Sequence, residues 1–153
     1  MPLTRRLPPP VRVAPALDSP LAGRQLCESR MHVVASPAFL SERRRVRSPR
    51  ELAARPALCF AVPSVRDEWR YSAGRRRGSV RVKPRLIATS SEALLRAALS
   101  GAGVSWLPSF VCGAELRAGR LVSLLPQFDF GTLNVYAVYP HRSFLPAKVR
   151  SFV

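Results

Sequence analysis

The chain has 153 residues, of which 47% are apolar and 22% charged, a composition typical of a globular protein. Its length predicts one domain with a sizeable core. No apolar run approaches the roughly 18 residues that a membrane span requires, which excludes a membrane protein built from apolar helices. The first ten residues hold four prolines and show no periodicity, so residues 1–10 are predicted to be an irregular segment without a signal peptide.

Twenty-five basic and nine acidic residues give a net charge of +16. All the basic residues except Lys83 and Lys148 are arginines, with local clusters at Arg43–Arg45 and Arg75–Arg77. Such a charge favours a nucleic acid or an acidic partner. The arginines are otherwise scattered, which favours the alternative of an arginine-biased surface without such a partner, and the sequence leaves both interpretations open.

Short apolar runs in the first half of the chain predict three strands: Val11–Ala14, Arg30–Ala35 and Leu58–Val62. A short helix is predicted after Ser36, because a serine followed by proline is typical of a helix cap and first turn. The same logic predicts a helix after Ser48, where Glu51 completes a capping box. Trp69–Tyr71 and Ser79–Val82 then read as a hairpin around a basic turn.

The stretch after a predicted strand at Arg85–Ala88 reads as a helix over residues 89–100. Thr89 and Glu92 have the spacing of a capping box. Leucines and alanines at intervals of four give the helix one apolar stripe, and glycines 101 and 103 end it. The remaining predicted elements are a strand at Val104–Leu107, a helix over 109–118, strands at Leu121–Leu125 and Leu133–Tyr139, and a last helix from Pro146. This alternation predicts an α/β fold with a largely parallel sheet.

No arrangement of residues typical of catalysis can be identified. The cysteines, Cys27, Cys59 and Cys112, form no C-x-x-C pair and are expected to be free thiols in a reducing compartment. His32 and His141 stand alone, without the cluster that a metal site needs. Without a nucleophile–base pair or paired carboxylates, the sequence predicts neither an enzyme nor a cofactor.

Several segments together resemble the effector-binding domain of LysR-type transcriptional regulators. Met31–Leu40 is similar to the family's strand followed by "ASPAYL", and Ser48–Ala54 to its "P-x-D/E-L" helix. The stretch 89–108 is similar to the second half of that domain, and Tyr136–Val153 to its "YAVYPHRRHLPAKVRAFV" tail. The resemblance implies a fold like that of type 2 periplasmic binding proteins, in which two α/β subdomains enclose a ligand cleft.

On this resemblance, residues 11–153 are a partial effector-binding domain. About 21–108 would be one near-complete subdomain, and about 120–153 the return segment of the other. The winged helix-turn-helix that binds DNA would be missing. The resemblance further implies a cytoplasmic bacterial regulator that binds a small effector and forms a homo-oligomer when intact, with no membrane partner.

Ligands of open α/β sheets bind beyond the carboxyl ends of strands. Those points are predicted at Ser36, Ala61, Thr89 and Tyr139, and the resemblance adds Arg24, Phe60, Trp69, Ser90 and Ser91 as effector-binding positions. Ser36 and Thr89 could instead be helix caps only, Phe60 and Trp69 core residues, and Arg24 a solvated surface charge. Family members commonly carry Asn-Asp where this chain has Thr89-Ser90, a difference that favours an anionic effector.

Two other interpretations remain. A small basic nucleic-acid-binding protein would need a contiguous basic face with exposed aromatic side chains. A non-functional remnant of a regulator would explain the missing half-subdomain.

Overall fold

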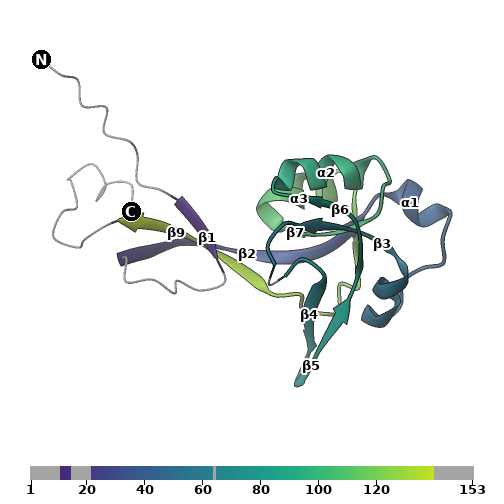
Figure 1. Ribbon diagram of the computed structural model, residues 1–153, viewed down its shortest axis with the longest axis horizontal. Helices are drawn as coiled ribbons and strands as arrows, with labels where there is room; N and C mark the ends of the chain where they lie inside the picture. The colour runs from purple at the N-terminus through teal and green to yellow at the C-terminus, as the bar shows by residue number, and fades with distance from the viewer. Residues whose placement is uncertain (1–10, 15–21, 64, 140–153) are drawn as a thin grey trace, which may run out of the picture. The chain divides into compact units, whose positions relative to one another are not determined.

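The structure, a computed structural model, describes residues 11–14, 22–63 and 65–139 (Figure 1). These residues fall into two compact units. The larger unit runs from Arg30 to Gly131, and the smaller unit contains the described residues before and after it. The predicted helix from Pro146 lies outside the described residues.

The smaller unit is a ribbon of antiparallel strands. β1 (Val11–Ala14) pairs with β9 (Thr132–Tyr139), so that Val11 lies opposite Ala137 and Ala14 opposite Asn134. β9 lies next to β2 (Ala22–Ala35), and Gln25 Nε2 donates a hydrogen bond of 3.0 Å to Asn134 Oδ1. The strands predicted at 11–14 and 133–139 are confirmed, and they are neighbours although over a hundred residues separate them.

The larger unit contains a mixed sheet. Its strands lie in the order β8 (Val122–Leu124), β2, β7 (Val104–Pro108), β3 (Pro56–Phe60) and β6 (Lys83–Ala88). β3 runs parallel to β6 and β7, whereas β2 runs antiparallel to β7 and β8. The expectation of a largely parallel sheet is therefore wrong. Val33, Val34 and Ala35 are fully buried as predicted, but such burial reflects a sheet covered on both faces, whichever way the neighbouring strands run.

Four short helices and a hairpin complete the larger unit: α1 (Pro37–Ser41), the 3-10 helix η1 (Pro49–Ala54), β4 (Glu68–Ala73), β5 (Arg76–Arg81), α2 (Ser91–Leu99) and α3 (Ser109–Arg117). Ser36 caps α1 as predicted, since its Oγ accepts the N–H of Phe39 at 3.2 Å. The capping box predicted at Ser48 is not formed, because the Ser48 side chain makes no cap bond and a 3-10 helix follows. Glu51 instead accepts the N–H of Arg47, the residue before the cap, and the hydroxyl of Ser48, both at 3.3 Å.

Helix α2 begins later than predicted. Its N-cap is Ser90, whose Oγ accepts the N–H of Ala93 at 3.3 Å, so the assignment of this cap to Thr89 is wrong. Strand pairing explains the shift, because β6 continues to Ala88, whose carbonyl accepts the N–H of Ala61 at 2.8 Å. Glu92 then cannot complete a capping box and forms an ion pair with Arg96 at 2.9 Å instead.

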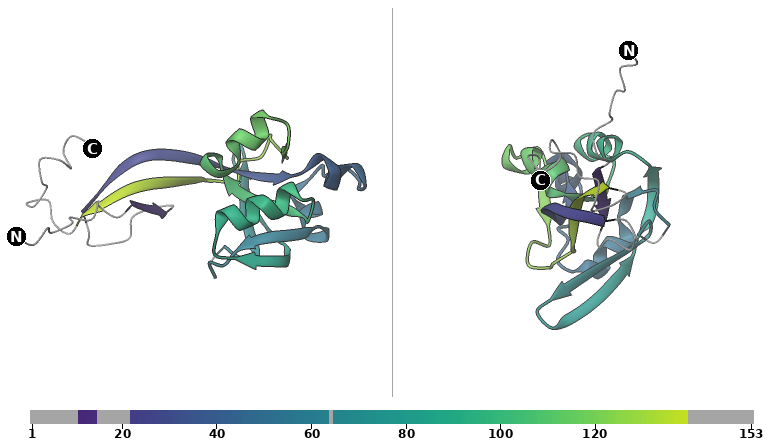
Figure 2. Two further views of the ribbon diagram at one scale, coloured as in Figure 1. Left: turned by 90° about the horizontal axis from the view of Figure 1, so that it is seen from above. Right: turned by 90° about the vertical axis from the view of Figure 1, so that its left-hand side faces the viewer.

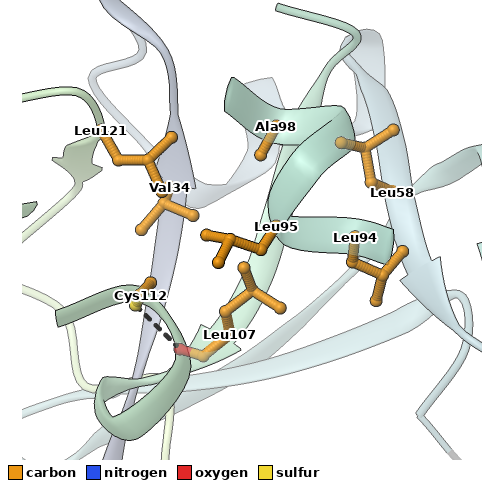
Figure 3. Close-up of a cluster of buried hydrophobic side chains, with 8 residues drawn as sticks. All are labelled: Val34, Leu58, Leu94, Leu95, Ala98, Leu107, Cys112 and Leu121. Carbon is orange, nitrogen blue, oxygen red and sulfur yellow. Dashed lines mark hydrogen bonds between the residues drawn. The ribbon is translucent and has the colours of Figure 1, made fainter. Parts of the chain in front are cut away.

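The core of the larger unit lies between the sheet and helices α2 and α3 (Figures 2 and 3). Its members come from β2, β3, α2, β7, α3 and the residue before β8: Val34, Leu58, Leu94, Leu95, Ala98, Leu107, Cys112 and Leu121. Burying each large aliphatic side chain contributes about 1.5–3 kcal/mol to the free energy of unfolding. This packing fixes α2, and with it the chain that joins β6 to α2, against the sheet.

Candidate functional site

The carboxyl ends of β3 and β6 meet at one edge of the sheet. Phe60 lies opposite Ala88 in the parallel register, and the chain turns immediately afterwards, where the Val62 N–H donates to the Phe60 carbonyl at 2.8 Å. The hydrogen bond from Ala61 to Ala88 holds this turn next to Thr89. The structure therefore brings together three of the predicted positions, Phe60, Ala61 and Thr89.

The start of α2 adds polar groups to the same edge. Thr89 and Ser90 are exposed and Ser91 is half-buried. The first N–H groups of any α-helix lack a carbonyl partner within the helix, and the dipole of the helix places partial positive charge there. Hydroxyl and amide donors at this point can hold a carboxylate or phosphate. Glu92 weakens this attraction, although its carboxylate is already paired with Arg96.

Ser36 does not belong to this edge. β2 runs antiparallel to β7, so the end of β2 lies at the opposite edge of the sheet from the ends of β3 and β6. Ser36 lies beside Gly101, beyond the last turn of α2, where a Cβ on the glycine would be 3.5 Å from the serine Oγ. The prediction that Ser36 shares an edge with Thr89 is wrong, and its buried hydroxyl serves as a cap.

Trp69 is part of the core. Its side chain is 1% exposed and stacks on Trp106, with ring centroids 6.5 Å apart. Trp106 in turn donates its Nε1–H to the carbonyl of Phe130 at 3.2 Å. Because Trp69 presents almost no surface, its burial favours the alternative that this residue belongs to the core. Phe60 packs against the core cluster but keeps a partly exposed surface.

Two predicted positions lie in the smaller unit. Arg24 is an exposed residue of β2, and Tyr139 is the last residue of β9. Their assignment to the effector site remains a prediction.

The described cysteines and histidine have structural environments. Burial raises the pKa of Cys59 and of Cys112 to about 11, and Asp67 adds to the effect at Cys59. All three cysteines are free, and Cys27 is exposed. His32 lies with its Nε2 2.8 Å from Ser109 Oγ, which donates to the carbonyl of Arg30. Burial, and then the charge of Arg30, lower the pKa of His32.

Neither a metal site nor a membrane span is found in the part of the chain that the structure describes. No group of three His, Cys, Asp or Glu side chains there could hold a metal ion. None of the helices over 22–63 and 65–139 is long and apolar enough to cross a membrane.

One hollow was missed by reasoning from sequence. Arg43, Arg45 and Arg47 line a groove beside α1, at the other edge of the sheet from Thr89. Their alternate spacing in the chain is the signal that could have identified it, because alternate residues of an extended segment point the same way.

Comparison with known proteins gives a consistent result. Residues 9–153 match the family model described as the LysR substrate binding domain. The regulator PtxR of Pseudomonas aeruginosa is 36% identical over 143 residues, which cover 94% of this chain and 46% of that protein. CrgA of Neisseria meningitidis is 30% identical over 137 residues, 89% of this chain and 46% of the relative. The chain thus spans about half the length of the curated relatives it matches.

Solved structures agree with the sequence matches. The CrgA regulatory domain superposes with a TM-score of 0.78 at 29% identity, covering 93% of this chain and 71% of that one. The full-length virulence activator AphB of Vibrio cholerae gives a TM-score of 0.78 at 25% identity, covering 93% of this chain and 48% of AphB.

Proposed function

This chain belongs to the family of LysR substrate-binding domains, and from that premise we propose that it binds an anionic effector at the start of α2. The curated relatives are bacterial transcriptional regulators, which supports a sensing role without catalysis in the cytoplasm. In the intact regulator, a homo-oligomer would bind DNA through a helix-turn-helix. The effector would act by favouring one arrangement of the regulator over another.

The observation that carries the proposal is the group of donors at one sheet edge. Thr89 and Ser90 are exposed hydroxyl residues next to the first turn of α2, and the Phe60–Ala61 turn is held beside them. Phe60 supplies partly exposed apolar surface, which suits a ligand with a ring or chain as well as a carboxylate.

The test uses two substitutions of Ser90 that both preserve its cap. Aspartate and asparagine cap helices about as well as serine, so neither Ser90→Asp nor Ser90→Asn should unfold the first turn. Only the aspartate adds negative charge. We expect Ser90→Asp to weaken the binding of benzoate or sulfate, measured by calorimetry, by about 1–3 kcal/mol, because like charges are brought together.

The asparagine variant should bind these anions as the unmodified chain does. Equal affinity for all three proteins would remove this segment from the site. A loss common to both variants would mean that the hydroxyl itself, rather than the charge, determines binding, and would contradict the anionic preference.

A further inference from the structure

The groove beside α1 is lined by side chains of two kinds. It has a volume of about 810 Å³ and lies between the residues around α1 and the segment from β8 to Gln127. Its apolar lining includes Leu40, Val46 and Leu124. Its basic lining consists of Arg43, Arg45 and Arg47, and no acidic side chain lines it.

The segment that carries the arginines is held at three points. The guanidinium of Arg43 lies over the ring of Phe39, 4.1 Å from its centroid, and donates to the Phe39 carbonyl at 3.2 Å. The Arg44 carbonyl accepts a hydrogen bond of 2.6 Å from Arg55 Nη2. The backbone N–H of Arg47 is bound by a Glu51 carboxylate oxygen at 3.3 Å. A backbone fixed in this way loses less entropy when its side chains bind a ligand.

The arginine side chains of the groove have little ion pairing. Their one ion pair is between Arg43 and Glu42 at 3.8 Å, and the Glu42 side chain is itself 78% exposed. The Glu51 carboxylate lies beside the segment but is bound to the backbone N–H of Arg47. Over residues 22–63 and 65–139, no acidic group lies within ion-pair distance of the side chains of Arg45 or Arg47. Their planar forks of N–H donors match the oxygens of carboxylates and phosphates.

We propose that this groove binds a metabolite-sized anion that carries two or more negative charges on an apolar body. Its volume falls within the range of about 300–1,000 Å³ that is typical of small-molecule sites. Three arginines match several charges, and the leucine and valine side chains match the apolar body. The groove lies at the opposite sheet edge from Thr89 and Ser90, so it is separate from the effector site proposed above.

The probe for a test is benzene-1,3,5-tricarboxylate, with benzoate as its singly charged counterpart. The variant combines Arg45→Gln with Arg47→Gln, and both positions are exposed. A control variant combines Arg75→Gln with Arg77→Gln, two exposed arginines in and beside the β4–β5 turn. Both variants remove two charges, so any general electrostatic attraction falls equally in each.

We expect the tricarboxylate to bind the unmodified chain at least about tenfold more tightly than benzoate does, as measured by calorimetry at physiological salt. The groove variant should lose about tenfold or more in affinity, and the control should stay within about twofold. Methyl NMR shifts should map to Leu40, Val46 and Leu124.

Three results would overturn the proposal. The first is an equal loss of affinity in the groove and control variants. The second is that Ser90→Asp weakens tricarboxylate binding while the groove variant binds it as the unmodified chain does. That result would place the tricarboxylate at the effector site. The third is binding of hexaglutamate in the groove with no binding of the tricarboxylate, which would indicate an acidic peptide partner. If the effector proposal alone is wrong, the groove variant should still lose affinity for the tricarboxylate.

Discussion

Replacing Gly103 by alanine should destabilise the larger unit through a clash that no side-chain rotation can relieve. Gly103 is a buried residue of the turn that joins α2 to β7. A Cβ there would lie 2.4 Å from the carbonyl oxygen of Pro56 and 3.1 Å from its carbon, far closer than the roughly 3.5 Å of ordinary contact. Both atoms are backbone of β3, a strand flanked by β6 and β7.

Overpacking a core costs about 1–3 kcal/mol and occasionally more. Because the obstacle is a hydrogen-bonded strand, we expect Gly103→Ala to lower the free energy of unfolding by about 3 kcal/mol, a large part of the 5–15 kcal/mol typical of a domain. Urea denaturation followed by far-ultraviolet circular dichroism measures the difference.

Gly113→Ala is the matched control. Gly113 lies inside α3, and its new Cβ would meet only Arg117 Nη1, the mobile end of a side chain, at 3.3 Å. Alanine is a better helix former than glycine by about 1 kcal/mol, so this variant should be slightly more stable than the parent. A Gly103→Ala protein within about 0.5 kcal/mol of the parent would refute the close approach of β3 to the turn before β7.

Three further predictions follow from the caps and titrating groups. Ser90→Ala should lower the free energy of unfolding in urea by about 1 kcal/mol because the α2 cap is lost, whereas Thr89→Ala should leave it almost unchanged. The reverse order would identify Thr89 as the cap. At pH 8, the exposed Cys27 should react with a thiol reagent well before Cys59 and Cys112, because a pKa of about 11 keeps those two buried thiols protonated. Equal reaction rates for all three cysteines in the folded chain would contradict the burial of Cys59 and Cys112. The pKa of His32 is lower in the folded chain, so the unfolded chain takes up this proton first as the pH falls through about 6.5. The free energy of unfolding should therefore decline more between about pH 7.5 and 5.5 in the parent than in His32→Gln. The same pH dependence in both proteins would contradict the shift.

Local patterns in the sequence predicted most elements of the larger unit. The predicted hairpin is found, although β5 begins at Arg76 and its turn is therefore shorter than predicted. The strand predicted at Val104–Leu107 is found as well and includes Pro108. Serine followed by proline correctly located the start of α1. These signals succeed because caps, turns and apolar alternation involve groups within a few residues of one another.

Properties that depend on distant partners could not be read in the same way. The direction of β2 relative to β7 depends on the path that the chain takes between them, which local patterns do not encode. A fully buried apolar run has the same pattern whether its neighbouring strand is parallel or antiparallel. That direction decided where Ser36 lies, so the error in sheet topology became an error in the site. The cap of α2 shifted because pairing of β6 with β3 holds Ala88 in the sheet.

The aromatic pair in the larger unit has a practical consequence for measuring stability. The sequence contains only two tryptophans, Trp69 and Trp106, and both belong to this stacked pair. Intrinsic tryptophan fluorescence therefore reports the unfolding of the larger unit alone, while circular dichroism also detects the β1–β9 ribbon. Denaturation curves from the two signals that fail to coincide would show that the two units unfold independently, and a single free energy of unfolding would then not describe the chain.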